Sequence, residues 1–250
     1  MANTVRKNGE RVGLLDEIRG FAIICMVVYH AMYQLKFIHE VNVPFFFEGW
    51  FDIIRDVFAG TFIFISGIMC RYSRNNLKRG VQCFFLGMVI TFVTPFFSDE
   101  YIYFGILHFL GIAMMIYGLF GQYLENLPAL VGFIISALLA VTTWNIRLGF
   151  FGIPGIFEWN LPRAAYDVGV LFPLGMYNEY FLSSDYFPIL PHIFVFLGGS
   201  YFGEWAKNGS LPRFFYPTHI KWLANVGRYT IWIYMLHVPV IYFIFLLIFH

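Results

Sequence analysis

Long apolar segments alternate with short polar or basic links along the chain. Seven of them approach the length of about 20 mostly apolar residues that a membrane-spanning helix needs. By residue number they are 18–38, 52–70, 79–97, 101–121, 127–146, 187–205 and 224–248. The pattern therefore predicts an all-α fold: a polytopic membrane helix bundle with about seven transmembrane helices, formed by a single domain, 1–250.

The longest link, 147–186, fits neither a free loop nor a regular span. It is too apolar for a loop, and glycines and prolines interrupt it too often for a continuous helix. Irregular backbone at membrane depth is stable only where protein or a water-filled cavity satisfies its polar groups. We expect a re-entrant or interfacial segment, with a short eighth helix within 165–182 as the alternative. Pro188 and Pro191 are expected to break the start of the next span.

The basic residues predict the orientation. With the N-terminus in the cytoplasm, 12 of the 16 Lys and Arg residues lie on the inner side, as the positive-inside rule requires. They are Arg6, Lys7, Arg11, Arg19, Arg71, Arg74, Lys78, Arg79, Lys207, Arg213, Lys221 and Arg228. The link Ser98-Asp99-Glu100, the stretch 147–186 and His250 then lie outside. We expect a multi-pass protein, located in the cytoplasmic (inner) membrane if the source is bacterial.

Composition agrees with a lipid environment. Hydrophobic residues make up 59% of the chain and charged residues 12%, against about 45–50% and about 25% in soluble domains. The net charge of +1 gives no reason to expect nucleic acid as a partner. The three cysteines lie in or beside apolar segments and suggest neither a disulfide framework nor a metal site.

The first predicted span carries Arg19 and His30. Eleven residues separate them, which is about three helical turns, so they lie on nearly one face and about 16 Å apart along the axis. This geometry suits an elongated anionic ligand that enters from the cytoplasm, with Arg19 on a phosphate and His30 at the reacting end. Arg71 and Arg79 are further candidates for binding the ligand's phosphates. Alternatively, Arg19 only anchors the helix and His30 only packs.

The second predicted span begins with Asp52, Arg55 and Asp56. Ionisable residues inside spans are costly, and function is their default interpretation. Asp52 and Asp56 share a helix face, whereas the adjacent Arg55 and Asp56 do not, so we do not expect these two to pair. Asp56 is a candidate for orienting a histidine or binding an acceptor amine, and Arg55 for binding substrate. Alternatively, Asp56 pairs with a basic residue of a neighbouring helix.

Three further histidines occur in predicted spans. His108 lies about seven residues from the outer end of its helix, roughly 10 Å deep, which matches the depth of His30. His192 and His237 lie in the last two spans. Four histidines at one broad level suggest a polar cavity, and we select His192, His237 and Asp185 as candidate substrate-binding residues. Each histidine by itself could instead be a packing residue.

Histidine is the side chain best suited to accept a proton near neutral pH. An acceptor hydroxyl or amine must lose a proton when it attacks an acyl thioester, and a histidine can be the base. The oxyanion that forms then needs hydrogen-bond donors, such as a second histidine, Arg55 or backbone N–H groups. The sequence contains no Walker loop, Rossmann fingerprint, G-x-S-x-G elbow or zinc motif.

Several segments resemble known membrane acyltransferases. RVGLLDEIRGFAIICMVVYHAM resembles the first helix of the acyltransferase-3 family, which carries Arg, ten residues and then His, here Arg19 and His30. The remainder resembles the catalytic domain of heparan-alpha-glucosaminide N-acetyltransferase and its small bacterial relatives. Its supporting segments, which cover about half of the chain in the family's order, are RDVFAGTFIFISGIM, YFGILHFLGIAMMI, SSDYFPILPHIFVFLGGSYFGEW and VGRYTIWIYMLHVPVI.

The resemblance implies a donor and an acceptor. The donor is acyl-CoA, with acetyl-CoA first, bound from the cytoplasm, and no metal is implied. The acceptor is a carbohydrate or lipid-linked molecule at the outer face. Asp56 falls where the family has a functional Asp, but Phe46 stands in place of the heparan enzyme's catalytic His. His30 replaces an Asn and His108 a Gln. We therefore assign catalysis to His30, Asp56 and His108.

Two other functions stay open at this point. A small transporter or exporter of a polar metabolite could use the same cavity, because interrupted helices often mark transport sites. A haem or quinone protein could use histidines of facing helices as ligands. The sequence also leaves open the acyl chain length, N- or O-acylation, and whether the chain forms a homodimer.

Overall fold

The computed structural model describes residues 12–44, 46, 49–96 and 101–249. The link Ser98-Asp99-Glu100, the basic residues Arg6, Lys7 and Arg11, and His250 lie outside the described residues. Their predicted sides of the membrane therefore stay predictions.

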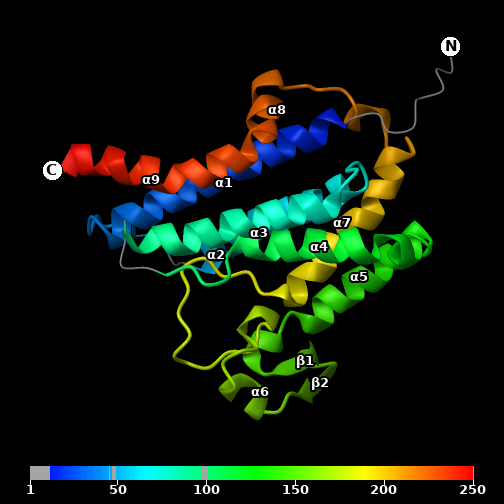
Figure 1. Ribbon diagram of the computed structural model, residues 1–250, viewed down its shortest axis with the longest axis horizontal. Helices are drawn as coiled ribbons and strands as arrows, with labels where there is room; N and C mark the ends of the chain where they lie inside the picture. The colour runs from blue at the N-terminus through cyan, green and yellow to red at the C-terminus, as the bar shows by residue number, and fades with distance from the viewer. Residues whose placement is uncertain (1–11, 45, 47–48, 97–100, 250) are drawn as a thin grey trace. The chain divides into compact units, whose positions relative to one another are not determined.

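Helices dominate the described part of the chain (Figure 1). The long ones are α1 (Gly13–Phe37), α2 (Gly49–Cys70), α3 (Asn76–Val93), α4 (Ile106–Leu124), α5 (Ala129–Thr143), α7 (Ile189–Lys207) and α9 (Thr230–Phe249). Within these described ranges, six helices are long and apolar enough to cross a membrane: α1, α2, α3 with its following turn, α4, α5 with its following turn, and α9. The prediction of an all-α integral membrane bundle is confirmed.

Helix α7 occupies the predicted span 187–205 but is not among those six. Its first turn is broken at Leu190, which has extended dihedrals (φ −97°, ψ 129°), because the residue before a proline avoids the helical region. Its last turns contain Gly, Ser, Glu and Lys, which make this helix less apolar than the other six.

The direction of α9 bears on the number of crossings. Contacts along α1 and α9 advance together: His30 meets His237, Gln34 meets Val238 and His39 meets Phe249. The two helices are therefore parallel, as Figure 1 also shows. Parallel helices cross the membrane in the same direction, which requires an odd number of crossings from the first to the last. With six apolar spans already assigned, we infer that α7 is the seventh crossing.

The contacts divide the chain into two compact units. Unit 1 comprises the residues up to Ile65 and from Ala206 onward, and unit 2 comprises Ser66–Trp205. In unit 1, α1 packs against α9 and against the short helix α8 (Lys221–Arg228). The predicted span 224–248 was wrong at its start, because α8 ends before Tyr229 and α9 begins at Thr230.

Glycines allow α8 to lie directly on α1. A Cβ at Gly20 would collide with the backbone oxygen of Leu223, and a Cβ at Gly227 with that of Asp16. The buried Glu17 side chain accepts hydrogen bonds from the backbone N–H groups of His219 and of Ile220, the latter at 2.9 Å. Ile220 is the residue at the N-cap of α8, and its N–H is one of those that would otherwise lack a partner.

Unit 2 is built on a similarly close pair, α3 and α4. A Cβ at Gly80 would lie 2.7 Å from the backbone oxygen of Gly111, and one at Gly111 would lie 2.6 Å from Phe84. Small residues at such contacts let membrane helices approach closely and gain van der Waals packing. In the same unit, Gly67 of α2 meets the backbone of Phe196 in α7.

The stretch 147–186 contains a β-hairpin that the sequence analysis missed. Strands β1 (Phe150–Ile153) and β2 (Phe157–Asn160) pair antiparallel, with Ile153 opposite Phe157. The three-residue loop between them includes Gly155 at φ +77°, a left-handed conformation that favours glycine. The alternative of an eighth helix within 165–182 is wrong, because α6 (Ala164–Asp167) has only four residues.

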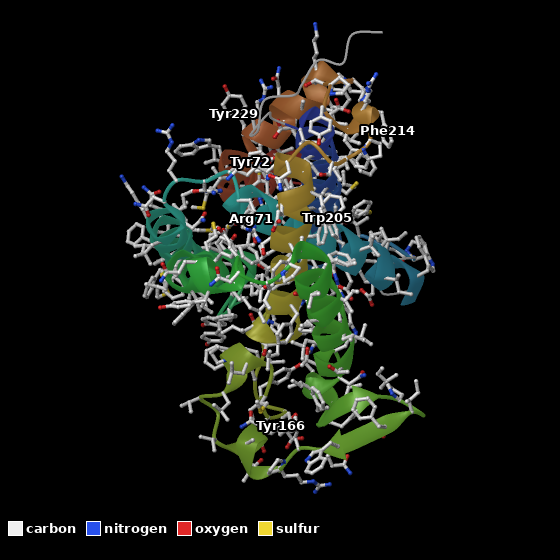
Figure 2. The ribbon with its side chains drawn as sticks, turned by 90° about the vertical axis from the view of Figure 1, so that its right-hand side faces the viewer. Arg71, Tyr72, Tyr166, Trp205, Phe214 and Tyr229 are labelled. Atoms are coloured by element: carbon white, nitrogen blue, oxygen red, sulfur yellow. The ribbon has the colours of Figure 1, made fainter. Side chains whose placement is uncertain are left out.

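The remainder of this stretch is held by tyrosines. The hydroxyl of Tyr186 donates to the backbone oxygen of Phe172 at 2.5 Å, and burial raises the pKa of this phenol. Tyr166 donates to the backbone oxygen of Ile146. Figure 2 shows Tyr166 and Arg71 toward opposite ends of unit 2. The interfacial location of the stretch stays a prediction.

Candidate functional site

The clearest candidate site lies in unit 1, where α1 and α9 bring two histidines together. The ring centroids of His30 and His237 are 4.9 Å apart, at an interplanar angle of 67°. His237 is 7% exposed. The sequence placed both histidines inside spans at one broad level, and the structure brings their rings into contact.

The hydrogen bonds of the two rings assign their tautomers. Nδ1 of His30 lies 3.0 Å from the backbone oxygen of Met26, and Nδ1 of His237 lies 2.7 Å from that of Tyr234. Because a carbonyl oxygen only accepts, each Nδ1 carries a proton, and each neutral ring keeps its lone pair on Nε2. The Nε2 atom of His237 is buried and has no hydrogen-bond partner among the described residues. The pair therefore places two imidazoles side by side, with Nε2 of His237 able to accept a hydrogen bond.

Arg19 lies on the same continuous helix as His30, as predicted, and is half-buried. Its helix also buries Asp16, whose carboxylate is 3.9 Å from Arg228 of α8. This end of α1 is therefore rich in charge, with carboxylates and guanidinium groups side by side.

Arg55 joins both aspartates of α2. Its Nη1 is 3.0 Å from Oδ1 of Asp52, and its Nε is 2.9 Å from Oδ1 of Asp56. The expectation that Arg55 and Asp56 would not pair was wrong. The flexible stem of arginine and its forked head let one guanidinium reach two positions on the helix surface. The carboxylates are 37% and 50% exposed, so these pairs stabilise the helix by at most about 1 kcal/mol.

Tyr29 connects this cluster to the histidines. Its hydroxyl accepts a hydrogen bond from Arg55 at 3.4 Å, and its ring lies edge-on to His30 at 5.7 Å. The centroid of the same ring lies 5.2 Å from that of Phe46. Phe46, which stands where the resembled heparan enzyme has a catalytic histidine, is buried among aromatic rings. A phenyl ring cannot transfer a proton, so that task cannot reside at position 46.

In unit 2, His108 lies at the start of α4 with both ring nitrogens engaged. Nδ1 accepts from the backbone N–H of Gly105 at 3.2 Å, which places the proton on Nε2, 3.3 Å from Oγ1 of Thr91. Asp185 accepts from the next backbone N–H, that of Ile106, at 3.1 Å. Both side chains therefore cap α4. These contacts favour a positioning role, and the predicted catalytic role of His108 stays a prediction.

His192 lies in α7 among aromatic side chains. Its Nδ1 is 2.8 Å from the backbone oxygen of Pro188, and its ring contacts Phe187, Phe109 and Trp144 at centroid distances of 5.3, 5.7 and 6.4 Å. Within unit 1 the structure brings His30 and His237 together, and the predicted gathering of all four histidines stays a prediction.

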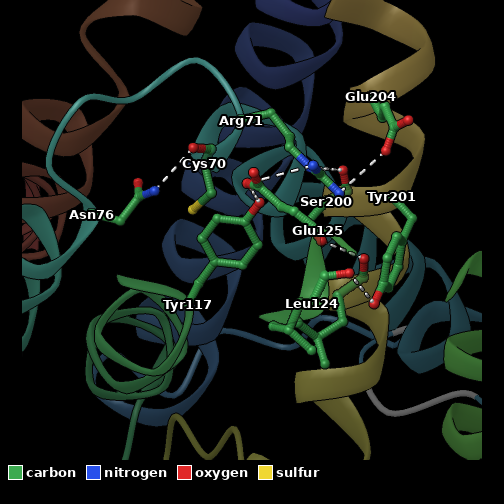
Figure 3. Close-up of polar contacts among 10 residues, drawn as sticks. Cys70, Arg71, Asn76, Tyr117, Leu124, Glu125, Ser200, Tyr201 and Glu204 are labelled. Atoms are coloured by element: carbon green, nitrogen blue, oxygen red, sulfur yellow. Dashed lines mark hydrogen bonds and ion pairs between the residues drawn. The ribbon is translucent and has the colours of Figure 1, made fainter. Parts of the chain in front are cut away.

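Arg71 forms a polar network at the end of α2 (Figure 3). Its side chain is 8% exposed, and its Nε donates to the backbone oxygen of Ser200 at 3.0 Å. Its Nη atoms lie 3.4 Å from Glu125 and 3.5 Å from Glu204. Tyr117 also donates to Glu125, at 2.7 Å. A guanidinium held by two carboxylates is poorly placed to bind a phosphate.

The exposed basic residues beside Arg71 are better placed. Arg74, Lys78 and Arg79 all lie on the surface of the α2–α3 turn and the start of α3. Of the two predicted phosphate ligands in this region, Arg79 therefore has the more suitable environment.

The fold and this arrangement define a polytopic integral membrane protein with a histidine pair inside its helix bundle. The family model of the catalytic domain of heparan-alpha-glucosaminide N-acetyltransferase matches residues 11–239. The chain belongs to this family of membrane acetyltransferases, which confirms the resemblance found in the sequence. No curated protein and no solved structure matches the chain significantly.

Proposed function

We propose that the chain transfers an acetyl group from cytoplasmic acetyl-CoA to a sugar or lipid-linked acceptor at the outer face of the membrane. The observation that carries the proposal is the contact of His30 with His237 inside a bundle of the acetyltransferase family. The cytoplasmic N-terminus, predicted from the basic residues, sets the direction.

The reaction assigned to this pair is acyl transfer. The acceptor's nucleophilic oxygen or nitrogen attacks the thioester carbonyl carbon and transfers its proton to Nε2 of His30. The carbon–sulfur bond then breaks, and the CoA thiolate leaves and takes up a proton. His237, whose Nε2 can accept a hydrogen bond, orients the hydroxyl or amine of the acceptor molecule.

The remaining predicted residues fall into two groups. Arg55 and Asp56 are half-exposed beside Tyr29, which supports their assignment to the acceptor. His108 and Asp185 hold the first turn of α4, which supports positioning rather than proton transfer. His192 keeps its assignment as a substrate contact.

The donor end of the proposal rests on Arg19 and Arg79. Arg19 is half-buried on α1, and Arg79 is exposed on α3 beside Arg74 and Lys78. Guanidinium groups bind phosphates bidentately, which suits the phosphates of CoA. All four residues lie on the side that the charge distribution predicts to be cytoplasmic.

The test is acetyl transfer by the purified protein in lipid nanodiscs. Radiolabelled acetyl-CoA is supplied with glucosamine as the acceptor, and labelled product is counted for the native protein, His30→Ala and His219→Ala. His219 is a matched control because it is an exposed histidine of the same unit, whose Nε2 lies 2.8 Å from the backbone oxygen of Phe214. We expect His30→Ala to lose about 10²-fold or more in rate, the minimum contribution of general base catalysis.

A rate of His30→Ala equal to that of the control, in protein that inserts and unfolds normally, contradicts the mechanism. Flux of a polar metabolite through proteoliposomes without acetyl-CoA, combined with no acetyl transfer, contradicts the proposed function itself and favours a transporter.

A further inference from the structure

Three buried polar atoms in unit 1 share an unusual property. Oε1 of Gln34, Nε2 of His39 and Nε2 of His237 have no hydrogen-bond partner within the part of the chain that the structure describes. Gln34 is 5% exposed and His237 7%. Buried polar groups are almost always hydrogen-bonded in folded proteins, commonly to ordered water when protein offers nothing. Three exceptions in one place call for hydrogen-bond partners from outside the protein.

All three atoms lie along the contact of α1 with α9, which we call the α1–α9 seam. The amide nitrogen of Gln34 donates to the backbone oxygen of Val238 at 3.2 Å, one residue after His237. The ring of His39 stacks on Phe249 with centroids 4.7 Å apart. Apart from these side chains, the end of α9 is apolar. The seam is thus a polar line inside an apolar contact, running from His30 to the ends of both helices.

The polar side chains of the seam follow one another along α1. His30 and Gln34 are one turn apart, about 6 Å along the axis. The backbone N–H of His39 bonds to the backbone oxygen of Gln34, so His39 begins the next turn. One water that joins two groups spans two hydrogen bonds of about 2.8 Å each, or about 5.6 Å. A short run of waters is therefore enough to connect steps of this size.

We propose that the α1–α9 seam is a water-mediated proton path that connects His30 and His237 to the solvent at the ends of α1 and α9. Gln34 orients the waters through its fixed amide, and His39 passes the proton to the solvent. The proposal rests on the proposed acetyl transfer, and it makes Gln34 and His39 positioning and relay residues rather than substrate ligands.

The proton balance of the reaction gives the path a purpose. A hydroxyl acceptor loses one proton, the CoA thiolate takes it up, and none is left over. The matched family is one of N-acetyltransferases, and a protonated amine loses two protons when its nitrogen bonds to the acetyl carbon. The thiolate takes one, and the other must leave the site before the next turnover. With such an acceptor, the path beside the base carries away one proton for each acetyl group transferred.

Two readouts test the seam. Hydroxyl-radical labelling, started by radiolysis of bound water in nanodisc-embedded protein, reports ordered water without requiring activity. We expect His39 and His237 to be labelled in the native protein and His237 to lose its label in Gln34→Leu. Ile233, on the same helix, is a control for general exposure. No labelling of either histidine in the native protein overturns the path.

The second readout is kinetic. With glucosamine as acceptor, we expect Gln34→Leu and His39→Ala to lower kcat about tenfold with unchanged KM values for both substrates. This loss is smaller than the about 10²–10⁴ that a primary acid–base group contributes. Added imidazole should restore part of the rate of His39→Ala and leave His219→Ala unaffected.

The outcomes separate the two proposals. If the histidines of the native protein are labelled but no acetyl group is transferred, the proposed function is refuted, and the labelling shows only that the seam holds water. Active protein whose seam variants keep the native kcat refutes the path. A rise in the acceptor KM alone shows that the seam binds the acceptor, which also refutes the path.

Discussion

Arg71 provides the sharpest test of what the second unit's polar network does. The side chain is almost fully buried, donates to the Ser200 backbone oxygen and lies between the carboxylates of Glu125 and Glu204. A sequence-based assignment made it a ligand of CoA. The contacts instead assign it to holding α2, α7 and the end of α4 together within unit 2. Replacing it separates the two interpretations.

The magnitude follows from these contacts. A hydrogen bond to a charged group contributes about 1.5–3 kcal/mol. The two carboxylates are 45% and 34% exposed, so each ion pair adds no more than about 1 kcal/mol. In Arg71→Met the new side chain retains packing similar to that of the arginine stem. We therefore expect Arg71→Met to lower the free energy of unfolding by about 3 kcal/mol.

The assay is reversible unfolding in mixed micelles, followed by tryptophan fluorescence, for Arg71→Met and Arg79→Met. Arg79 is exposed on α3, so its substitution should change stability by less than about 0.5 kcal/mol. In calorimetric titration with CoA, the order should reverse, with Arg79→Met weakening affinity more than Arg71→Met. Unchanged stability of Arg71→Met, together with a large loss of CoA affinity, would refute the structural interpretation.

Three further changes have definite expected outcomes. Gly227→Leu should detach α8 from α1, because its Cβ would collide with the Asp16 backbone. Limited proteolysis should then cut the variant within 206–229. The control Gly60→Ala, where a Cβ meets nothing within 4 Å, should stay resistant to the protease. Glu17→Ala should cost about 1–2 kcal/mol of stability by uncapping α8, measured by unfolding in micelles. Tyr117→Phe should cost about 1 kcal/mol, because Glu125 can turn to water when the hydroxyl is lost; a loss above 3 kcal/mol would contradict this.

The sequence predicted most of the spans because each one is a local property. A helix in lipid must satisfy its backbone hydrogen bonds within itself, so length and apolarity alone identify it. The errors came where this condition is relaxed. Leu190 interrupts α7, Tyr229 separates α8 from α9, and the hairpin 150–160 satisfies its backbone by strand pairing.

The residues of the site were also found in part. His30 and His237 stood out because ionisable groups are rare in spans. Gln34 was missed because its amide is not ionisable, although its position one turn after His30 places it on the same helix face. His39 was missed because it follows the end of the first predicted span.

The partners of these residues were decided by tertiary structure. His30 meets His237, and Arg71 meets Glu204, across separations in the chain that no helical period encodes. Hydrophobic length determines which segments enter the membrane, since each segment is partitioned by its own free energy of transfer. It does not determine which faces of the helices pack together. The packing of helix faces depends on complementary shapes, such as those at Gly20 and Gly227. This packing brought together residues that are far apart in the chain, as the histidine pair and as the network around Arg71.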